Sequence, residues 1–220
     1  MTDVRAALFD LDGTLTDTVD LIAQQVSRTL QEYGIACRPE QVVPYIGVPL
    51  AQCLESLMPG FTTDERFPGF VKLYRSRASA ASTAAGPGLL FPGIPELLSA
   101  LREAGWKVAV VTAKQTWMAR KVLDSTGLTD SIDLVIGTDQ VAAGKPAPDS
   151  AYLAMERLGT TPENTWYIGD AATDMQMTLS AGIPGMGVTT GAGSREELLA
   201  AGARVVVDSA HEIFDALNAA

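Results

Sequence analysis

Residues 104–112 read AGWKVAVVT and contain the pattern that decides the fold. Gly105 follows a helical stretch, and a glycine just past a helix ends it in the left-handed conformation without steric cost. The apolar run after it does not alternate with polar residues, so both faces of the predicted strand are buried. Such apolar runs predict strands at residues 6–10, 107–112, 134–138, 165–170, 185–189 and 204–208. Strands that alternate with helices in this way predict an α/β fold, a mostly parallel sheet with helices on both faces.

The segment between residues 16 and 85 lacks this repeated order of helix, glycine and apolar strand, and its pattern is helical. It predicts no strand, and its helices are expected at residues 20–34, 49–58 and 67–82. About seventy residues thus interrupt the sheet after its first strand. The stretch at 79–88 is rich in small residues, which suits a flexible boundary. We predict two domains, an α/β core from residues 1–15 and 86–220 and an inserted helical cap from residues 16–85.

The composition supports a packed globular protein and limits its partners. Hydrophobic residues make up 47% and charged residues 19% of the chain, as in ordinary globular domains. The net charge of -10 disfavours nucleic acid, because binding a polyanion needs clustered Lys and Arg. Cys37 and Cys53 match no metal or redox spacing and are expected to be buried within helices. No secretory signal and no apolar stretch of ~18 residues occurs, so we expect a cytoplasmic protein that does not bind membranes.

Two carboxylates follow the first predicted strand, at the sheet edge where open α/β sheets bind ligands. Asp10 and Asp12 lie where this strand gives way to a turn. Gly13 permits the tight turn, and the freed backbone amides there could bind an anion. Carboxylates this close repel each other unless a cation or a proton lies between them. The alternative is a solvated Asp-Gly turn with an incidental second aspartate.

Asp170 and Asp174 form a second acidic cluster. Asp170 ends a buried strand, and Asp174 follows about one helical turn later. Together with the first pair they would make a hard oxygen site suited to Mg²⁺. Alternatively, Asp170 caps the following helix and Asp174 is solvated.

Two loops add groups that could bind phosphate. Lys145 lies in a rigid loop between glycine and proline, with a surface lysine as the alternative. Thr112 and the amides that follow it, including that of Ala113, could hold phosphate oxygens at a helix start. Lys114 is expected at the surface.

Other reaction types find little support. The sole histidine, His211, lies near the C-terminus, which disfavours a Ser-His-Asp hydrolase or a histidine zinc site. A Walker A loop is absent, because Pro146 follows Lys145. The glycines that follow the fourth helix–strand unit match no dinucleotide-binding motif and are assigned to strand and loop geometry; they are Gly185, Gly187, Gly191 and Gly193.

Four motifs, taken in order, resemble those of the haloacid dehalogenase (HAD) superfamily, in the subgroup similar to phosphoglycolate phosphatase. They are FDLDGTLTD (9–17), VVTAK (110–114), GKPAPD (144–149) and YIGDAATDM (167–175). The resemblance implies a HAD-like, Rossmann-like core. It also implies that the helical insertion is a C1 cap, which would determine substrate specificity.

The resemblance further implies how each core residue would act. Asp10 would be the nucleophile that forms an aspartyl-phosphate intermediate. Asp12 would protonate the leaving oxygen and later take a proton from water. Thr112 and Lys145 would hold the phosphoryl oxygens. The phosphate-binding set would comprise Gly13, Thr112, Ala113 and Lys145.

The metal site and the substrate-facing turn are also implied by the resemblance. Mg²⁺ would lie on the carboxylates of Asp10 and Asp170 and on the Asp12 backbone carbonyl, with Asp174 supporting the site. The turn around Gly47 would face the substrate, although an ordinary turn between helices is an equal alternative. Two arginines of the cap, Arg75 and Arg77, could meet an acidic substrate but are expected on a solvated helix face.

The resemblance favours phosphate-ester hydrolysis over related reactions. An acid at residue 12 fits phosphatases, whereas the dehalogenase and phosphonatase branches lack it. Residues 16–18 resemble β-phosphoglucomutase-like sugar phosphomutases, but those enzymes place a histidine soon afterwards and residues 21–25 contain none. Ala113 stands where phosphoglycolate phosphatases usually have Asn, which weakens that exact substrate. We predict a phosphatase for a small phosphorylated metabolite, as a monomer or homodimer, with a mutase as the alternative. A phospho-accepting receiver or a silent phosphate-binding module is more remote.

Overall fold

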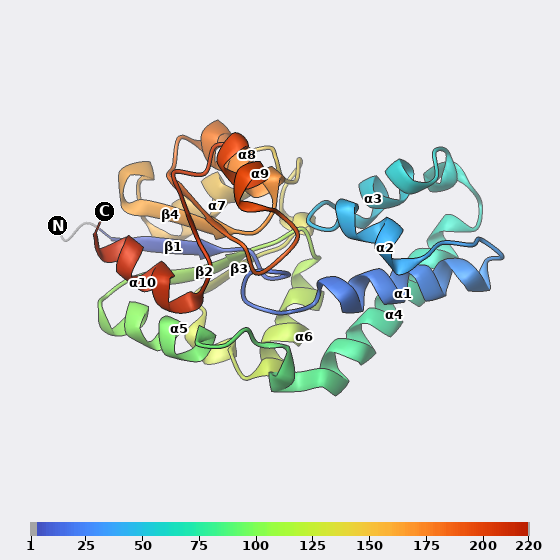
Figure 1. The fold of residues 1–220 in the computed structure, drawn as a ribbon, viewed down its shortest axis with the longest axis horizontal. Coiled ribbons are helices and arrows are strands. Elements are labelled where there is room, and N and C mark those ends of the chain that lie inside the picture. Colours follow the sequence, from blue (N-terminus) through green and yellow to red (C-terminus); the bar gives the residue numbers. More distant parts are fainter. Residues whose placement is uncertain (1–3, 220) are drawn as a thin grey trace.

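The sheet places strand β1 near its centre. Within residues 4–219, which this computed structural model describes, six parallel strands follow the order β3-β2-β1-β4-β5-β6 (Figure 1). Their bounds are β1 Ala6–Phe9, β2 Lys107–Val111, β3 Leu134–Ile136, β4 Thr165–Gly169, β5 Gly185–Val188 and β6 Val205–Val207. All six predicted strands and their parallel arrangement are confirmed. Because β1 lies between β2 and β4, the residues after these three strands meet at one edge of the sheet.

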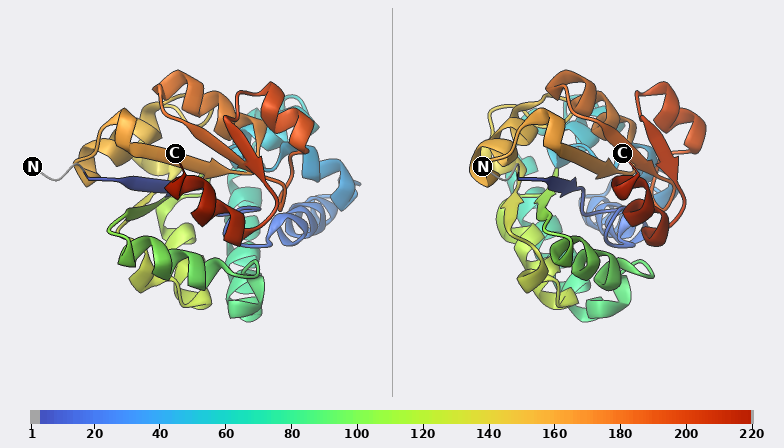
Figure 2. Two further views of the ribbon diagram at one scale, coloured as in Figure 1. Left: turned by 60° about the vertical axis from the view of Figure 1, so that its left-hand side comes forward. Right: turned by 90° about the vertical axis from the view of Figure 1, so that its left-hand side faces the viewer.

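Helices cover both faces of the sheet, as the end-on view in Figure 2 shows. One face carries α5 (Ile94–Glu103), α6 (Thr116–Thr126) and α10 (Ala210–Asn218). The other carries α7 (Asp149–Leu158), α8 (Ala172–Ala181) and α9 (Arg195–Ala200). Successive strand residues enter opposite cores, with Leu8 facing α7 and α8 and Phe9 facing α5 and α6. No helix within residues 4–219 has the length and apolar character needed to cross a membrane.

The glycines in the repeating unit end helices as predicted. Gly127, Gly159 and Gly182 follow α6, α7 and α8 with φ of 77°, 69° and 69°, the left-handed region. Gly105 and Gly202 also have positive φ, at 80° and 109°.

Four helices between β1 and α5 build a third hydrophobic core beside the sheet (Figure 1). They are α1 (Val19–Glu32), α2 (Pro39–Val42), α3 (Leu50–Leu57) and α4 (Phe67–Ala85). Phe70, which is fully buried, packs against Tyr33, Phe61 and Tyr74 at ring-centroid distances of 5.8, 5.5 and 6.4 Å. A separate core of this kind is what the predicted cap requires, and the domain division at residues 16–85 stays a prediction.

The two connections between these helices and the sheet run side by side. Thr16 pairs with Leu90 in an antiparallel bridge. The Asp17 amide donates to the Leu89 carbonyl at 2.7 Å, and the Phe91 amide donates to the Leu15 carbonyl at 3.3 Å. The chain therefore leaves and re-enters the α/β part through one short pair of segments.

Three local expectations need correction. The small residues expected to form a flexible boundary at 79–88 continue α4 to Ala85, because alanine favours helix and the buried Ser82 packs inward. Cys37 is buried as expected but lies in the loop between α1 and α2, whereas Cys53 is buried within α3. The four-residue helix α2 was not predicted, since a helix this short has no apolar period to recognise.

Candidate active site

Three neighbouring strands deliver three buried polar side chains to one edge of the sheet. Asp10 follows β1, Thr112 follows β2 and Asp170 follows β4, and their exposed fractions are 2%, 5% and 2%. Backbone pairing continues past β1, because the Asp10 amide donates to the Ile168 carbonyl at 2.9 Å. The parallel register therefore brings these three residues together at one edge of the sheet.

Asp10, Asp170 and Asp174 form a compact buried acidic cluster. Each offers a carboxylate oxygen, and these oxygens all lie within 4.8 Å of one another. Burial raises the pKa of Asp10 to about 6, and the neighbouring carboxylates of Asp174 and Asp12 add to the rise. Burial and the charges of Asp10 and Asp174 raise the pKa of Asp170 to about 8. The cluster therefore has a high affinity for a proton or another cation.

Lys145 is the internal counter-ion of this cluster. Its Nζ lies 2.6 Å from Asp174 Oδ1 and 3.0 Å from Asp10 Oδ1, and the side chain is almost fully buried. Burial disfavours the ammonium, but the carboxylates of Asp10 and Asp174 raise the pKa of Lys145 well above its ordinary value. The surface-lysine alternative is therefore wrong. One ammonium among three ionised carboxylates leaves two negative charges uncompensated.

Asp174 uses its oxygens within the protein. Its Oδ1 accepts from Lys145 and lies 3.0 Å from the hydroxyl of Tyr167, while its Oδ2 accepts from the Ala171 amide at 3.1 Å. The Tyr167 hydroxyl also lies 2.9 Å from the Val111 carbonyl oxygen. Sequence reasoning did not single out Tyr167, although a tyrosine on a fully buried strand must find a polar partner. Because both of its oxygens already have partners within the protein, Asp174 is suited to supporting the acidic cluster.

The carboxylate of Asp170 is held by residues from two other segments. Oδ1 accepts from the Thr14 hydroxyl at 2.9 Å, and Oδ2 accepts from the Ala192 amide at 2.9 Å. The Gly193 amide donates to the Asp170 backbone carbonyl, also at 2.9 Å. The segment after β5 was not predicted to contribute to the site, because its glycines match no motif.

Two glycines allow the backbone to approach Asp170 closely. A Cβ at Gly13, whose φ is +81°, would lie 2.3 Å from Asp170 Oδ2, and a Cβ at Gly191 would lie 1.9 Å from it. The Thr190 hydroxyl donates to the Gly13 carbonyl at 2.7 Å and joins the two loops. A single sequence cannot distinguish such a close-approach glycine from an ordinary loop glycine, so Gly191 was assigned to loop geometry alone.

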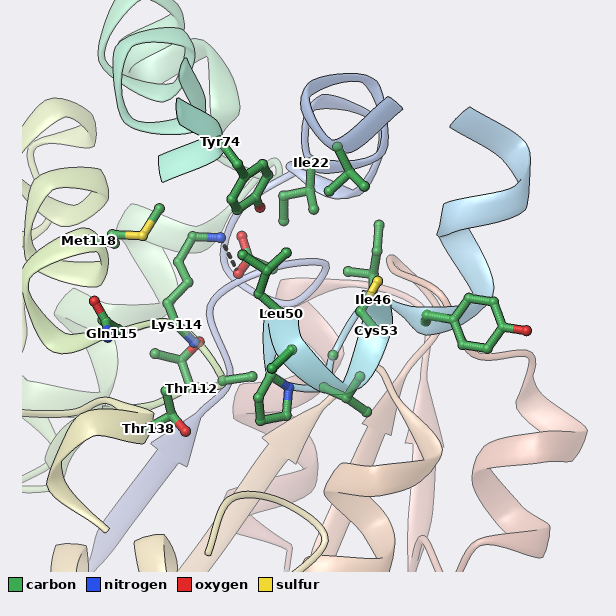
Figure 3. A pocket seen from close by; sticks show the side chains of 18 of the residues that line it. Ile22, Ile46, Leu50, Cys53, Tyr74, Thr112, Lys114, Gln115, Met118 and Thr138 are labelled. Carbon is green, nitrogen blue, oxygen red and sulfur yellow. Dashed lines mark hydrogen bonds and ion pairs between the residues drawn. The ribbon is translucent and has the colours of Figure 1, made fainter. Parts of the chain in front are cut away.

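The carboxylate of Asp12 lies outside the acidic cluster. Its Oδ1 accepts from the Thr18 hydroxyl at 2.5 Å. Its Oδ2 accepts from Lys114 Nζ, also at 2.5 Å, the dashed contact of Lys114 in Figure 3. The expectation of Lys114 at the surface is wrong, because this pairing keeps its side chain 12% exposed. Asp10 and Asp12 therefore share one backbone turn, but only the Asp10 carboxylate belongs to the acidic cluster.

A pocket of about 250 Å³ lies between this edge of the sheet and helices α1, α3 and α4 (Figure 3). Asp10 and Asp12 line it together with Thr112 and Ala113 from the predicted phosphate-binding loop. Thr138, which follows β3, also lines it. Of the residues expected to bind phosphate, Thr112, Ala113 and Gly47 line this pocket, whereas Gly13 and Lys145 are not among its lining residues.

The turn around Gly47 also lines this pocket. Gly47 has φ of +99°, and a Cβ there would lie 3.1 Å from Ala171 Cβ, next to Asp170. Arg75, which is partly exposed, lines the pocket too. Arg77 does lie partly exposed, where it pairs with Glu32.

Two other polar residues at strand ends do not join the site. Asp139 accepts from the amide and hydroxyl of Thr116 at 2.6 and 2.8 Å and so caps α6. Thr189 donates to Asp208 at 2.6 Å. A polar residue at a strand end is therefore not sufficient evidence for a site.

Comparison with known proteins identifies the family. A family model described as haloacid dehalogenase-like hydrolase matches residues 7–188. The chain belongs to this family. Probable phosphatase IndB of Dickeya dadantii is 35% identical over 213 residues, which cover 96% of this chain and 93% of that protein. A phosphoglycolate phosphatase of Aquifex aeolicus is 33% identical over 180 residues, 81% of this chain and 82% of its own.

Solved structures support the same assignment. A hydrolase from Pseudomonas syringae superposes with a TM-score of 0.87 at 26% identity and covers 98% of each chain. The predictions of the HAD superfamily, of its α/β fold and of a phosphatase are thereby confirmed.

The donor set of this haloacid dehalogenase-like hydrolase fits a hard divalent cation. Asp10 Oδ1 is buried and accepts no hydrogen bond within the described residues, although the Lys145 ammonium lies 3.0 Å away. The oxygens of Asp10, Asp170 and Asp174 converge, and the charge left after Lys145 equals that of one divalent ion. Carboxylate oxygens are the ligands that Mg²⁺ and similar ions prefer.

Proposed function

We propose that this enzyme is a magnesium-dependent phosphomonoester hydrolase for a small phosphorylated metabolite, acting through an aspartyl-phosphate at Asp10. The convergence of the carboxylate oxygens of Asp10, Asp170 and Asp174, at a place where Asp10 lines a pocket, carries the proposal. Relatives named phosphoglycolate phosphatase support the same reaction type. The presence of both Asp10 and Asp12 agrees with phosphate-ester chemistry.

In the first step, a carboxylate oxygen of Asp10 attacks the substrate phosphorus and the bond to the alcohol oxygen breaks. Asp12 donates a proton to that oxygen, so that a neutral alcohol departs. In the second step, Asp12 takes a proton from water, which attacks the phosphorus and releases Asp10 and inorganic phosphate. Thr18 and Lys114 orient the Asp12 carboxylate toward the pocket side of the turn.

The charge of the phosphoryl group is met by fixed donors. Lys145 lies 3.0 Å from Asp10 Oδ1, close enough to contact a phosphate placed on that oxygen. Thr112 and Ala113 line the pocket that Asp10 also lines, and their hydroxyl and amide would donate to the phosphoryl oxygens. Donors preorganised in this way stabilise charge without reorganisation during the reaction.

Mg²⁺ would be held by the carboxylates of Asp10 and Asp170 and by the backbone carbonyl of Asp12, with Asp174 as support. When bound, it would reduce the repulsion between the anionic nucleophile and the anionic phosphate. The loops that fix Asp170 keep one ligand in place before the substrate arrives.

We expect phosphate release from a generic aryl phosphate to require Mg²⁺. Protein treated with EDTA should lose activity by at least about 10²-fold, since several kcal/mol of charge stabilisation are removed. Restoring Mg²⁺ should recover the rate, whereas Ca²⁺, which prefers more and longer oxygen contacts, should not. Phosphate release from the metal-free protein at the full rate would contradict the proposal.

Metal-free protein should become less stable as the pH rises. The folded-state pKa values of Asp10 and Asp170, about 6 and about 8, lie above their ordinary value of 3.8. The folded state therefore binds more protons than the unfolded chain in this range, and stability is lost as the pH rises through about 6 and about 8. We expect the thermal midpoint in EDTA to fall between about pH 5.5 and about pH 8.5, and Mg²⁺ to raise it most at the upper end of this range.

The matched variant for this measurement is Asp170→Asn. It removes the group that titrates highest, so the fall in thermal midpoint above about pH 7 should flatten. An unchanged slope in this variant would show that other groups cause the pH dependence.

A further inference from the structure

We propose that the alcohol released by this enzyme is an uncharged, apolar group, such as an aryl or branched alkyl alcohol. This inference rests on the proposed function, because it names the substrate class of the same site. The phosphate would lie at Asp10, on the floor of the pocket of about 250 Å³. The remainder of that pocket is the space left for the alcohol.

The walls of the pocket are formed by helices α1, α3, α4 and α6 and by the turn before α3. Most of their lining side chains are apolar; they include Ile22, Val26, Ile46, Leu50, Val71 and Met118. Figure 3 shows Ile22, Leu50 and Met118 around the space above the floor. Leu50 and Ile46 are only half-buried, so they keep apolar surface that a ligand can cover.

Polar side chains are concentrated on the floor, at the carboxyl edge of the sheet. They are Asp10, Asp12, Thr112, Lys114, Gln115 and Thr138. Lys114 is already paired with the Asp12 carboxylate at 2.5 Å and so offers no free charge to the alcohol. The hydroxyl of Tyr74 points toward this floor and not toward the wall (Figure 3). The polar groups are thus placed for the phosphate end of a substrate.

Arg75 is the one charged residue that the described part of the chain contributes to the walls. It also lines a second, more open groove between α4 and α6, with Lys72, Trp117 and Lys121. This position places Arg75 at the rim, where its guanidinium can remain in water. Recognition of an acidic substrate through Arg75 is therefore the competing outcome that the experiment must distinguish.

The apolar side chains of the pocket walls determine which substrate alcohol is preferred. A carboxylate or several hydroxyl groups placed against these side chains would lose water without gaining hydrogen bonds, which is costly. An apolar group of similar size would instead cover the exposed parts of Leu50 and Ile46. Each methylene placed in such a pocket favours one substrate over another by about 10-fold or more.

The test compares benzyl phosphate with phosphoglycolate and glucose 6-phosphate, all of which release alcohols. Acetyl phosphate serves as the reference, because its small acyl group reports the reaction at Asp10. We expect kcat/KM for benzyl phosphate to exceed that for either polar substrate by about tenfold or more. A higher kcat/KM for phosphoglycolate or glucose 6-phosphate would overturn the inference.

A variant of the wall tests the contact directly. In Leu50→Ala, the ratio of kcat/KM for benzyl phosphate to that for acetyl phosphate should fall about tenfold. The control is Leu199→Ala on α9, which truncates an exposed leucine away from the pocket and should leave the ratio unchanged. An unchanged ratio in Leu50→Ala would show that the wall does not contact the alcohol.

Binding of stable analogues separates this inference from the proposed function. Benzylphosphonate should bind at least about tenfold more tightly than phosphonoacetate in calorimetry with Mg²⁺ present, whether or not any ester is hydrolysed. Failure to hydrolyse any of the phosphate esters tested would contradict the proposed function alone. Tighter binding of phosphonoacetate, lost in Arg75→Gln, would instead assign an acidic substrate and overturn the inference.

Discussion

We expect Asp10→Asn to abolish phosphate release while the protein remains folded. The amide has nearly the same shape as the carboxylate but is not a nucleophile, so we expect the rate to fall by about 10⁴-fold or more. The same substitution removes one negative charge from a cluster in which two are uncompensated. The thermal midpoint in EDTA at about pH 8 should therefore rise, whereas the activity is lost.

The control for this experiment is Asp215→Asn, an aspartate on the exposed side of α10. It carries the same chemical change and should alter neither property. A phosphorylated form should be trapped with the native protein and with this control, and should be absent from the Asp10→Asn variant. Near-normal turnover by Asp10→Asn would exclude Asp10 as the nucleophile.

We expect Lys145→Met to destabilise the metal-free protein more than the same substitution of an exposed lysine. The substitution leaves Asp10 and Asp174 buried without their ammonium, and breaking a buried pair in this way costs about 3–5 kcal/mol. Lys145 lowers the pKa of Asp10, so its loss lets that pKa rise above about 6. Unfolding by urea in EDTA should show the large loss at about pH 8 and a smaller one at about pH 5.

Lys107→Met supplies the comparison. Lys107 pairs with Asp133 at 2.9 Å, but half of its side chain is exposed, and exposed pairs contribute about 0–1 kcal/mol. Equal losses of unfolding free energy in the two variants would contradict the role of Lys145 as a buried counter-ion. Activity should fall in Lys145→Met alone, because only this lysine reaches the proposed phosphate position.

The strands of the sheet could be predicted from the sequence because the patterns that indicate them are local. An apolar run after a helix-ending glycine reports burial on both faces wherever it occurs, and β2 and β4 lie where that pattern predicts them. The positions of Asp10 and Asp170 follow from the same logic, since parallel strands end at one edge. Their proposed functions came from the family resemblance and not from the spacing.

The contacts that the sequence did not predict join distant segments. Lys114 and Asp12 are 102 positions apart, and nothing near either residue indicates the other. The Ala192 amide reaches Asp170 across 22 positions, because the loop after β5 folds back over β4. Such pairs depend on strand order and loop path, which a periodic pattern does not specify.

The paired connections at Thr16 and Leu90 have a mechanical consequence. If helices α1–α4 rotate relative to the sheet, the two connecting segments at Thr16 and Leu90 are where the backbone would bend. Thr18 lies just past Thr16 and holds the Asp12 carboxylate. Because Lys114 holds the other oxygen of Asp12 from the α/β part, such a movement would separate the two residues that hold the carboxylate of the proposed proton donor.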